Sequence, residues 1–223
     1  MPTELHLALQ RHYAGDTGLI EADIGGYKAD VLRDDVVYEI QTGAFTAIRR
    51  KLQALCRTHR IVLVYPIPHQ KTIVRLDPTS GEELYARRSP KRGALIDVFA
   101  ELLHIPDVLQ HENVSLEVAM TVQRELRCDD ANGSWRRKGV SVIGHELVEV
   151  LETHRFDHPA DFLRLLPDGL PERFTVADIS DAAQISYSAA GRVAYGLRRL
   201  GVIQQVGKQG KAYVYQRSKG VAG

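Results

Sequence analysis

Cysteine is scarce in this sequence, and long apolar runs are absent. Cys56 and Cys128 stand far apart and lack metal-ligand spacing, so neither a disulfide framework nor a zinc site is expected. No apolar segment approaches the roughly 18 residues of a membrane span, and the first residues lack the basic and apolar regions of a signal peptide. The sequence therefore predicts a cytoplasmic protein without a membrane partner.

Two familiar catalytic signatures and a strong net charge are also missing. Neither a GxxxxGK[ST] phosphate loop nor a GxSxG elbow occurs, which disfavours an ATPase and a serine hydrolase. The net charge is only +1, but residues 172–223 carry eight Lys or Arg against three Asp or Glu. This local excess indicates either an anion-binding surface or an ordinary solvated segment.

Patterns in the first 70 residues are typical of an α/β layer. A helix is expected over 3–13, with Thr3 as its N-cap, and a second helix over 45–58. The run IVLVYPI (61–67) is typical of a strand buried on both faces of a sheet. Further strands are expected over 19–24, from residue 28, and over 36–41.

The middle of the chain predicts an α+β extension without a determined topology. Strands are expected over 72–76 and 114–127, the latter pairing with 135–142, and residues 147–153 suit either a strand or a helix. Helices are expected over 95–104 and 159–165, and a basic loop over 87–92. The sequence LPDGLPE at 166–172 favours a linker over 166–171, which divides the chain into domains 1–165, with its core at 1–70, and 172–223.

The segment KADVLRDDVVYEIQTG (28–43) holds the candidate catalytic residues. Asp30 begins a hairpin, while Glu39 and Gln41 share one face of its second strand because residues two apart do so. Two converging carboxylates on an apolar sheet are costly unless a positive charge lies between them. Mg²⁺ suits that position, held by one or two carboxylates and water.

This pattern, with its flanking helix, hairpin, helix and buried strand, resembles the PD-(D/E)XK nuclease superfamily over residues 1–70. The resemblance implies that Asp30 and Glu39 bind Mg²⁺ or Mn²⁺. Gln41 stands where the family usually has lysine, although some members carry glutamine there and others place the lysine on the following helix. Lys51 is the candidate on that helix, with Arg49 and Arg50 as alternative phosphate contacts.

The helix before the first strand often supplies a further acid in that superfamily, and Glu4 matches it. The helix dipole alone also favours an acid at this place. An alternative interpretation of the other two carboxylates has Asp30 capping a turn and Glu39 as a solvated edge residue.

Residues 172–217 resemble a winged helix-turn-helix domain. Thr175 is the expected N-cap of a helix ending near Ala183, a second helix is expected over 188–200, and two strands flank a basic turn at 207–211. The resemblance implies that the second helix enters the major groove and that the turn contacts phosphate. The implied DNA-binding residues are Ser186, Tyr187, Ser188, Arg192, Lys208 and Lys211.

Three functions are compatible with these patterns. The first is a metal-dependent DNA endonuclease whose winged helix binds duplex DNA. The second is a non-catalytic DNA-binding or regulatory protein, a homodimer assembled through a degenerate nuclease-like domain, which the missing lysine at Gln41 favours. The third is a protein-interaction adaptor, favoured only if DNA affinity is absent.

Overall fold

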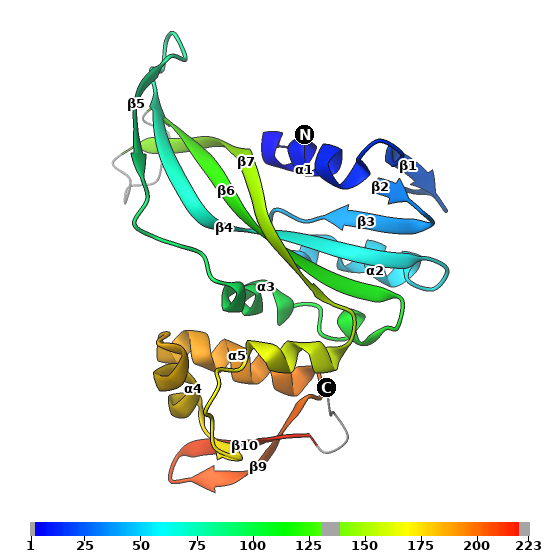
Figure 1. Cartoon of the computed structure of the whole chain (residues 1–223), viewed down its shortest axis with the longest axis vertical. Helices are drawn as coiled ribbons and strands as arrows, with labels where there is room; N and C mark the ends of the chain where they lie inside the picture. The colour runs from blue at the N-terminus through cyan, green and yellow to red at the C-terminus, as the bar shows by residue number, and fades with distance from the viewer. Residues whose placement is uncertain (1–2, 131–138, 219–223) are drawn as a thin grey trace.

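A long, twisted mixed sheet forms the frame of the computed structural model, which describes residues 3–130 and 139–218 (Figure 1). Its strands lie in the order β1-β2-β3-β4-β6-β7, and β5 also pairs with β4. The strands are β1 (Leu19–Ile24), β2 (Tyr27–Arg33), β3 (Val36–Ile40), β4 (Arg60–Leu76), β5 (Glu83–Arg88), β6 (Val114–Asp129) and β7 (Val140–Phe156).

Strand β4 is the centre of this sheet. It runs parallel to β3 on one side and to β6 on the other, whereas the remaining neighbours in the sheet are antiparallel. The pairing with β3 covers residues 60–64, and the pairing with β5 covers residues 72–76. Between them, one edge of β4 has no strand partner among the described residues. Pro66 and Pro68 lie in this stretch. Proline has no N–H to donate, and at this edge no neighbouring strand among the described residues requires one.

Helices cover both faces of the sheet. On one face lies α1 (Glu4–Ala14), which begins where the Thr3 hydroxyl accepts a hydrogen bond from the His6 N–H at 3.3 Å. Leu5, Leu9 and Tyr13 of α1 pack against buried aliphatic side chains of the sheet. The other face is covered by η1 (Phe45–Ala47), α2 (Arg49–Leu55), η2 (Leu95–Val98), α3 (Phe99–Leu102), η3 (Val108–Gln110) and η5 (Pro159–Leu165), where η denotes a 3-10 helix.

The C-terminal part combines two helices with a small antiparallel sheet of order β8-β10-β9. Its elements are β8 (Arg173–Phe174), α4 (Val176–Ala183), α5 (Tyr187–Arg199), β9 (Ile203–Gln209) and β10 (Ala212–Arg217). Thr175 caps α4 in a reciprocal arrangement with Asp178, and the Ser186 hydroxyl caps α5 by accepting from the Ala189 N–H.

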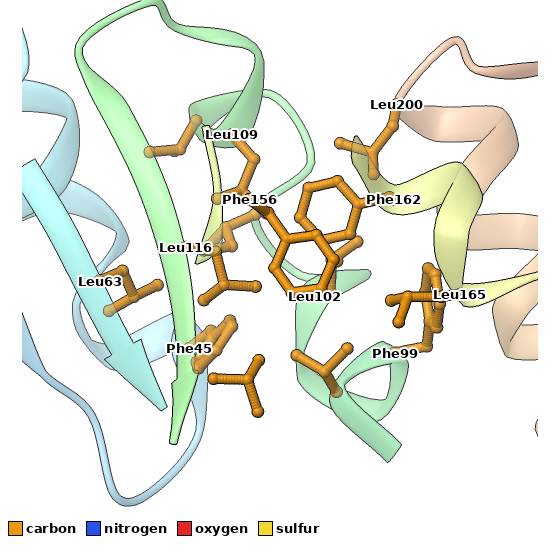
Figure 2. Close-up of a cluster of buried hydrophobic side chains, with 14 of the residues drawn as sticks. Phe45, Leu63, Phe99, Leu102, Leu109, Leu116, Phe156, Phe162, Leu165 and Leu200 are labelled. Carbon is orange, nitrogen blue, oxygen red and sulfur yellow. The ribbon is translucent and has the colours of Figure 1, made fainter. Parts of the chain in front are cut away.

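One hydrophobic core joins the C-terminal part to the sheet. Figure 2 shows Phe99, Phe162, Leu165 and Leu200 filling the space between the sheet and the C-terminal helices. A Cβ on Gly196 of α5 would lie 2.7 Å from the Phe99 ring, so α5 and α3 are in close contact. Residues 166–171 share this packing, since Leu166 is buried and Leu170 rests against the core. The division into two domains at this segment stays a prediction.

The expected mixed α/β architecture is confirmed, with differences in the middle of the chain. Residues 72–76 continue β4 rather than forming a separate strand, residues 87–88 of the expected basic loop belong to β5, and residues 147–153 are strand. The helix expected over 45–58 is divided into η1 and α2 and ends at Leu55. Part of the segment expected to pair over 135–142 lies outside the described residues.

Cys56 and Cys128 are buried free thiols. No helix in the described ranges has the length and apolar character required to cross a membrane.

Candidate active site

A pocket of about 260 Å³ opens where β3 ends, between α1 and α2. Its polar lining includes His6, Asp30, Glu39, Gln41 and Lys51. Three elements bring these side chains together: α1 supplies His6, the β2–β3 hairpin supplies both carboxylates, and α2 supplies Lys51. Four of the five predicted catalytic residues therefore line one pocket.

Glu39 is the most buried charged group of this pocket. Its side chain has 0% exposure, and the Lys51 Nζ donates to its Oε2 at 2.5 Å. Its Oε1 is buried and has no hydrogen-bond partner among the described residues. Burial, with Asp30 nearby, raises the pKa of Glu39 to about 7, while the Lys51 ammonium opposes this rise. Glu39 is thus not a solvated edge residue.

Asp30 holds the end of the β2–β3 hairpin. The ladder between these strands ends at the Val31–Tyr38 pair, and the Asp30 Oδ2 accepts from the Ile40 N–H at 2.7 Å. The Asp30 carboxylate therefore takes the place of a backbone acceptor beyond the last pair. Its Oδ1 lies 3.3 Å from the His6 Nε2 and 3.4 Å from the Gln10 Nε2. Contacts from both β3 and α1 therefore hold the Asp30 carboxylate in place.

His6 and Gln10 are site residues that the sequence analysis did not identify. The hydrogen bond to Asp30 raises the pKa of His6, against the opposing effect of burial. Gln10 is only 2% exposed and its Oε1 has no partner within the described part of the chain. The available signal was their i, i+4 spacing, which places both polar side chains on one helix face.

The other predicted residues around the pocket have different roles. Glu4 is exposed in the first turn of α1 and does not line the pocket. The Gln41 amide donates to the Ala44 carbonyl at 2.9 Å, so it holds the turn after β3. Arg49 pairs with Asp107 at 2.9 Å, which leaves Lys51 as the cation of α2 that reaches a carboxylate of the pocket.

The donor set suits a hard cation such as Mg²⁺. Within residues 3–130 and 139–218, no three His, Cys, Asp or Glu side chains are arranged to hold a metal ion. Mg²⁺ does not require such a cluster, because it commonly keeps several waters and binds one or two carboxylates. The unpartnered Glu39 Oε1 beside Asp30 is an oxygen that a cation would satisfy.

The predicted DNA-binding residues lie on exposed parts of the C-terminal elements. Tyr187 is 61% exposed at the start of α5, next to Ser186 and Ser188. Lys208 lies 5.1 Å from the centre of the Tyr213 ring on the neighbouring strand. Lys211 is exposed in the turn between β9 and β10.

Arg192 differs from these residues in its surroundings. It is exposed on α5, and its guanidinium donates to the Ser188 hydroxyl at 3.4 Å. It also lines a second pocket, which faces the large sheet.

Comparison with known proteins adds a family but no activity. A family model described as "Domain of unknown function (DUF8091)" matches residues 3–157. A protein from Treponema pallidum (strain Nichols), named "Uncharacterized protein", is 28% identical over 217 residues, which cover 96% of this chain and 85% of that protein. No solved structure matches the chain significantly. The matched segment contains the whole large sheet and the pocket at the end of β3, and it ends before α4 and α5.

Proposed function

The chain belongs to the DUF8091 family, a domain of unknown function, and from the chemistry of its pocket we propose that it is a metal-dependent DNA endonuclease of the PD-(D/E)XK type. The observation that carries this proposal is Glu39, a fully buried carboxylate that shares a pocket with Asp30 and contacts the Lys51 ammonium at 2.5 Å. Burying a charge of this kind is costly, so a fully buried carboxylate that lines a pocket favours a chemical task over a structural one.

Asp30 and Glu39 would hold Mg²⁺ or Mn²⁺. When bound, the ion would supply the means to activate water and to stabilise the charge that develops on a scissile phosphate. His6 and Gln10 fix the orientation of Asp30 through its Oδ1, and the Ile40 N–H fixes its Oδ2. These contacts keep the carboxylate in one position before any ligand arrives.

In this proposal Lys51 provides the positive charge that the PD-(D/E)XK superfamily usually places at the position of Gln41. Its ammonium lies in the pocket, where it is available to a phosphate oxygen as well as to Glu39. Gln41 contributes by holding the turn after β3, which carries the pocket wall.

The C-terminal elements support duplex DNA as the substrate. Two capped helices followed by a β-hairpin match the order of a winged helix-turn-helix domain, and the segment carries five excess positive charges. In this proposal, α5 and the turn between β9 and β10 bind DNA and so deliver the backbone to the pocket.

The test is nicking of supercoiled plasmid in the presence of Mg²⁺ or Mn²⁺. The Asp30→Asn and Glu39→Gln variants are expected to lose nicking while they keep duplex affinity, because both preserve side-chain shape and remove a metal ligand. Glu149→Gln is the matched control, since Glu149 is exposed on β7 and outside the pocket. Nicking by Glu39→Gln at the wild-type rate would rule out the proposed chemistry.

A second candidate function is a non-catalytic DNA-binding protein with a degenerate nuclease site. The observation that favours it is the Gln41 amide, which is already engaged by the Ala44 carbonyl. Wild-type protein that binds duplex DNA but nicks no plasmid under either metal would favour this candidate.

A further inference from the structure

A second pocket, of about 300 Å³, lies between β4 and α5. One part of its lining is the stretch of β4 from Tyr65 to Pro68, where the strand edge has no strand partner among the described residues. The lining also includes Lys91, from the loop after β5, and Arg192, from α5. A largely apolar strand segment and two cations from distant parts of the chain thus line the same pocket.

Neither of the two cations is paired with a carboxylate among the described residues, although the Arg192 guanidinium also donates to the Ser188 hydroxyl at 3.4 Å. Lys91 and Arg192 form no ion pair with any described residue, whereas Lys71, also at this pocket, donates to Glu125 at 2.6 Å. The one carboxylate of the lining, Asp97, accepts from the Ala94 N–H at 2.9 Å and so caps η2. Asp97 keeps its negative charge, so beyond the Lys71–Glu125 pair the lining of the pocket carries one net positive charge, from Lys91 and Arg192 against Asp97.

Gly93 shows that the loop carrying Lys91 is placed closely against β4. Its N–H donates to the Pro68 carbonyl at 3.0 Å. A Cβ on Gly93 would lie 2.5 Å from the Ile67 Cγ2 and 2.8 Å from the Pro68 carbonyl oxygen. A residue with a side chain would push the loop away, so glycine sets the position of Lys91 two residues earlier.

This pocket adjoins the candidate active site along β4. The Gln41 N–H at the rim of the active-site pocket donates to the Val64 carbonyl at 2.9 Å, and Tyr65 is the next residue of that strand. The ring of Phe45, in the segment that follows Gln41, lies 5.0 Å from the ring of Tyr65. The turn after β3 and the segment of β4 at Val64 and Tyr65 therefore connect the linings of the two pockets.

We propose that the pocket lined by Lys91 and Arg192 binds a backbone phosphate of the nucleic-acid strand that reaches the Asp30–Glu39 site. The proposal rests on the proposed function. Arginine binds phosphate oxygens in a bidentate manner, lysine adds a point charge, and the wall at Tyr65 suits the sugar or base beside the phosphate. Arg192 would then link the C-terminal part to the active-site pocket rather than contact bases in the major groove.

The test is fluorescence anisotropy of a labelled duplex over a salt series in EDTA, where no metal-dependent cleavage takes place. The double variant Lys91→Ala/Arg192→Ala is expected to lower affinity by about tenfold or more at about 0.1 M salt, and to reduce the log–log salt slope by roughly 1, the value for one phosphate contact. Arg87→Ala, which removes an exposed charge from β5, is the matched control and should leave the slope within roughly 0.5 of wild type.

A second variant fills the pocket without altering charge. Ala100 is exposed on α3 and lines the pocket, so Ala100→Phe should weaken duplex binding while the protein stays folded. Wild-type affinity and slope in both the double variant and Ala100→Phe would overturn the proposal. Absence of duplex binding by the wild-type chain would also overturn it.

Thymidine monophosphate, titrated by calorimetry, distinguishes a strand phosphate from a free nucleotide. Nucleotide binding that is lost in the double variant while duplex affinity is unchanged would overturn the strand assignment.

The nicking assay stays separate from these measurements. Loss of nicking in all proteins would reject the proposed catalysis, while the EDTA binding results would still decide the role of this pocket.

Discussion

Replacing Glu39 with glutamine is expected to stabilise the metal-free protein at neutral and alkaline pH. The folded protein raises the pKa of Glu39 from its ordinary value of 4.5 to about 7, chiefly through burial. A raised folded-state pKa means that the folded chain binds this proton more tightly than the unfolded chain. The stability that Glu39 contributes is therefore fully present below about pH 4.5 and is lost as the pH rises towards 7. Glutamine is neutral at every pH, so the variant avoids this loss.

The size of the effect follows from the same two pKa values. A difference between 4.5 and about 7, at 1.36 kcal/mol for each pH unit, gives a loss of about 3 kcal/mol. For a chain of this length, that corresponds to a difference in Tm of roughly 6–12 °C. The loss of the ion pair with Lys51 does not offset the stability gained by Glu39→Gln. The glutamine amide oxygen can still accept from the Lys51 ammonium, and the Lys51 side chain is 21% exposed to solvent.

Urea denaturation in EDTA at several pH values between 4.5 and 8 would measure this effect. The free energy of unfolding of wild type should fall relative to Glu39→Gln as the pH rises, and Mn²⁺ should restore only wild type because the variant lacks the metal-binding carboxylate. Glu149→Gln should follow wild type throughout. Parallel pH profiles for wild type and Glu39→Gln, or a variant less stable than wild type at pH 8, would refute the reasoning.

Two further expectations concern the C-terminal part. Gly196→Ala should destabilise the chain by about 1–3 kcal/mol in thermal or urea unfolding, because the new Cβ would lie 2.7 Å from the Phe99 ring. A Cβ at Gly191 of the same helix meets open space, so Gly191→Ala should stabilise the chain by up to about 1 kcal/mol. A Gly196→Ala variant more stable than Gly191→Ala would contradict the packing of α5 on α3. Changing both Lys208 and Lys211 to Ala should reduce the salt slope of duplex binding by roughly 2, and an unchanged slope would remove this turn from the DNA interface.

Local patterns in the sequence were enough to predict α1 and the strands β1 to β3, but not the division of the helix expected over 45–58 into η1 and α2. The expected strand over 19–24 coincides with β1, because a pair of glycines, Gly25 and Gly26, marks its end and both adopt positive φ. The Thr3 and Thr175 caps were also predictable, since each hydroxyl serves a backbone N–H of its own first turn. These features depend only on residues that are close in sequence.

The strand expected over 114–127 corresponds to β6, but the full length of β4 was not predictable, for a physical reason. Proline normally marks the end of a strand, and Pro68 lies between the expected strands 61–67 and 72–76. In the structure Pro66 and Pro68 lie where one edge of β4 has no strand partner among the described residues, while β6 pairs with the other edge along nearly the whole strand. That pairing joins residues about 50 positions apart, which no local pattern encodes.

The candidate site shows the same division between local and distant information. Asp30, Glu39 and Lys51 were identified because their spacing lies within one hairpin and the following helix. His6 and Gln10 were missed because their importance comes from the packing of α1 beside Asp30. A polar side chain on a helix usually faces water, and only the tertiary contact distinguishes Gln10 from its exposed neighbours.

Strand β4 explains how the two pockets and the C-terminal helices are held in a fixed relation. Its first residues pair with β3 and so position Glu39, while its edge from Tyr65 to Pro68, which has no strand partner among the described residues, lines the second pocket. The core on the face of the sheet that contains Leu63 extends through Phe99 to α5, which carries Arg192 (Figure 2). In a nuclease whose DNA-binding domain is joined by a flexible linker, orienting bound DNA at the active site costs conformational entropy. In this protein α5 packs on the same core as β4, which runs beside the candidate site, so under the proposed function a duplex bound by the C-terminal part would meet the Asp30–Glu39 pocket in one orientation.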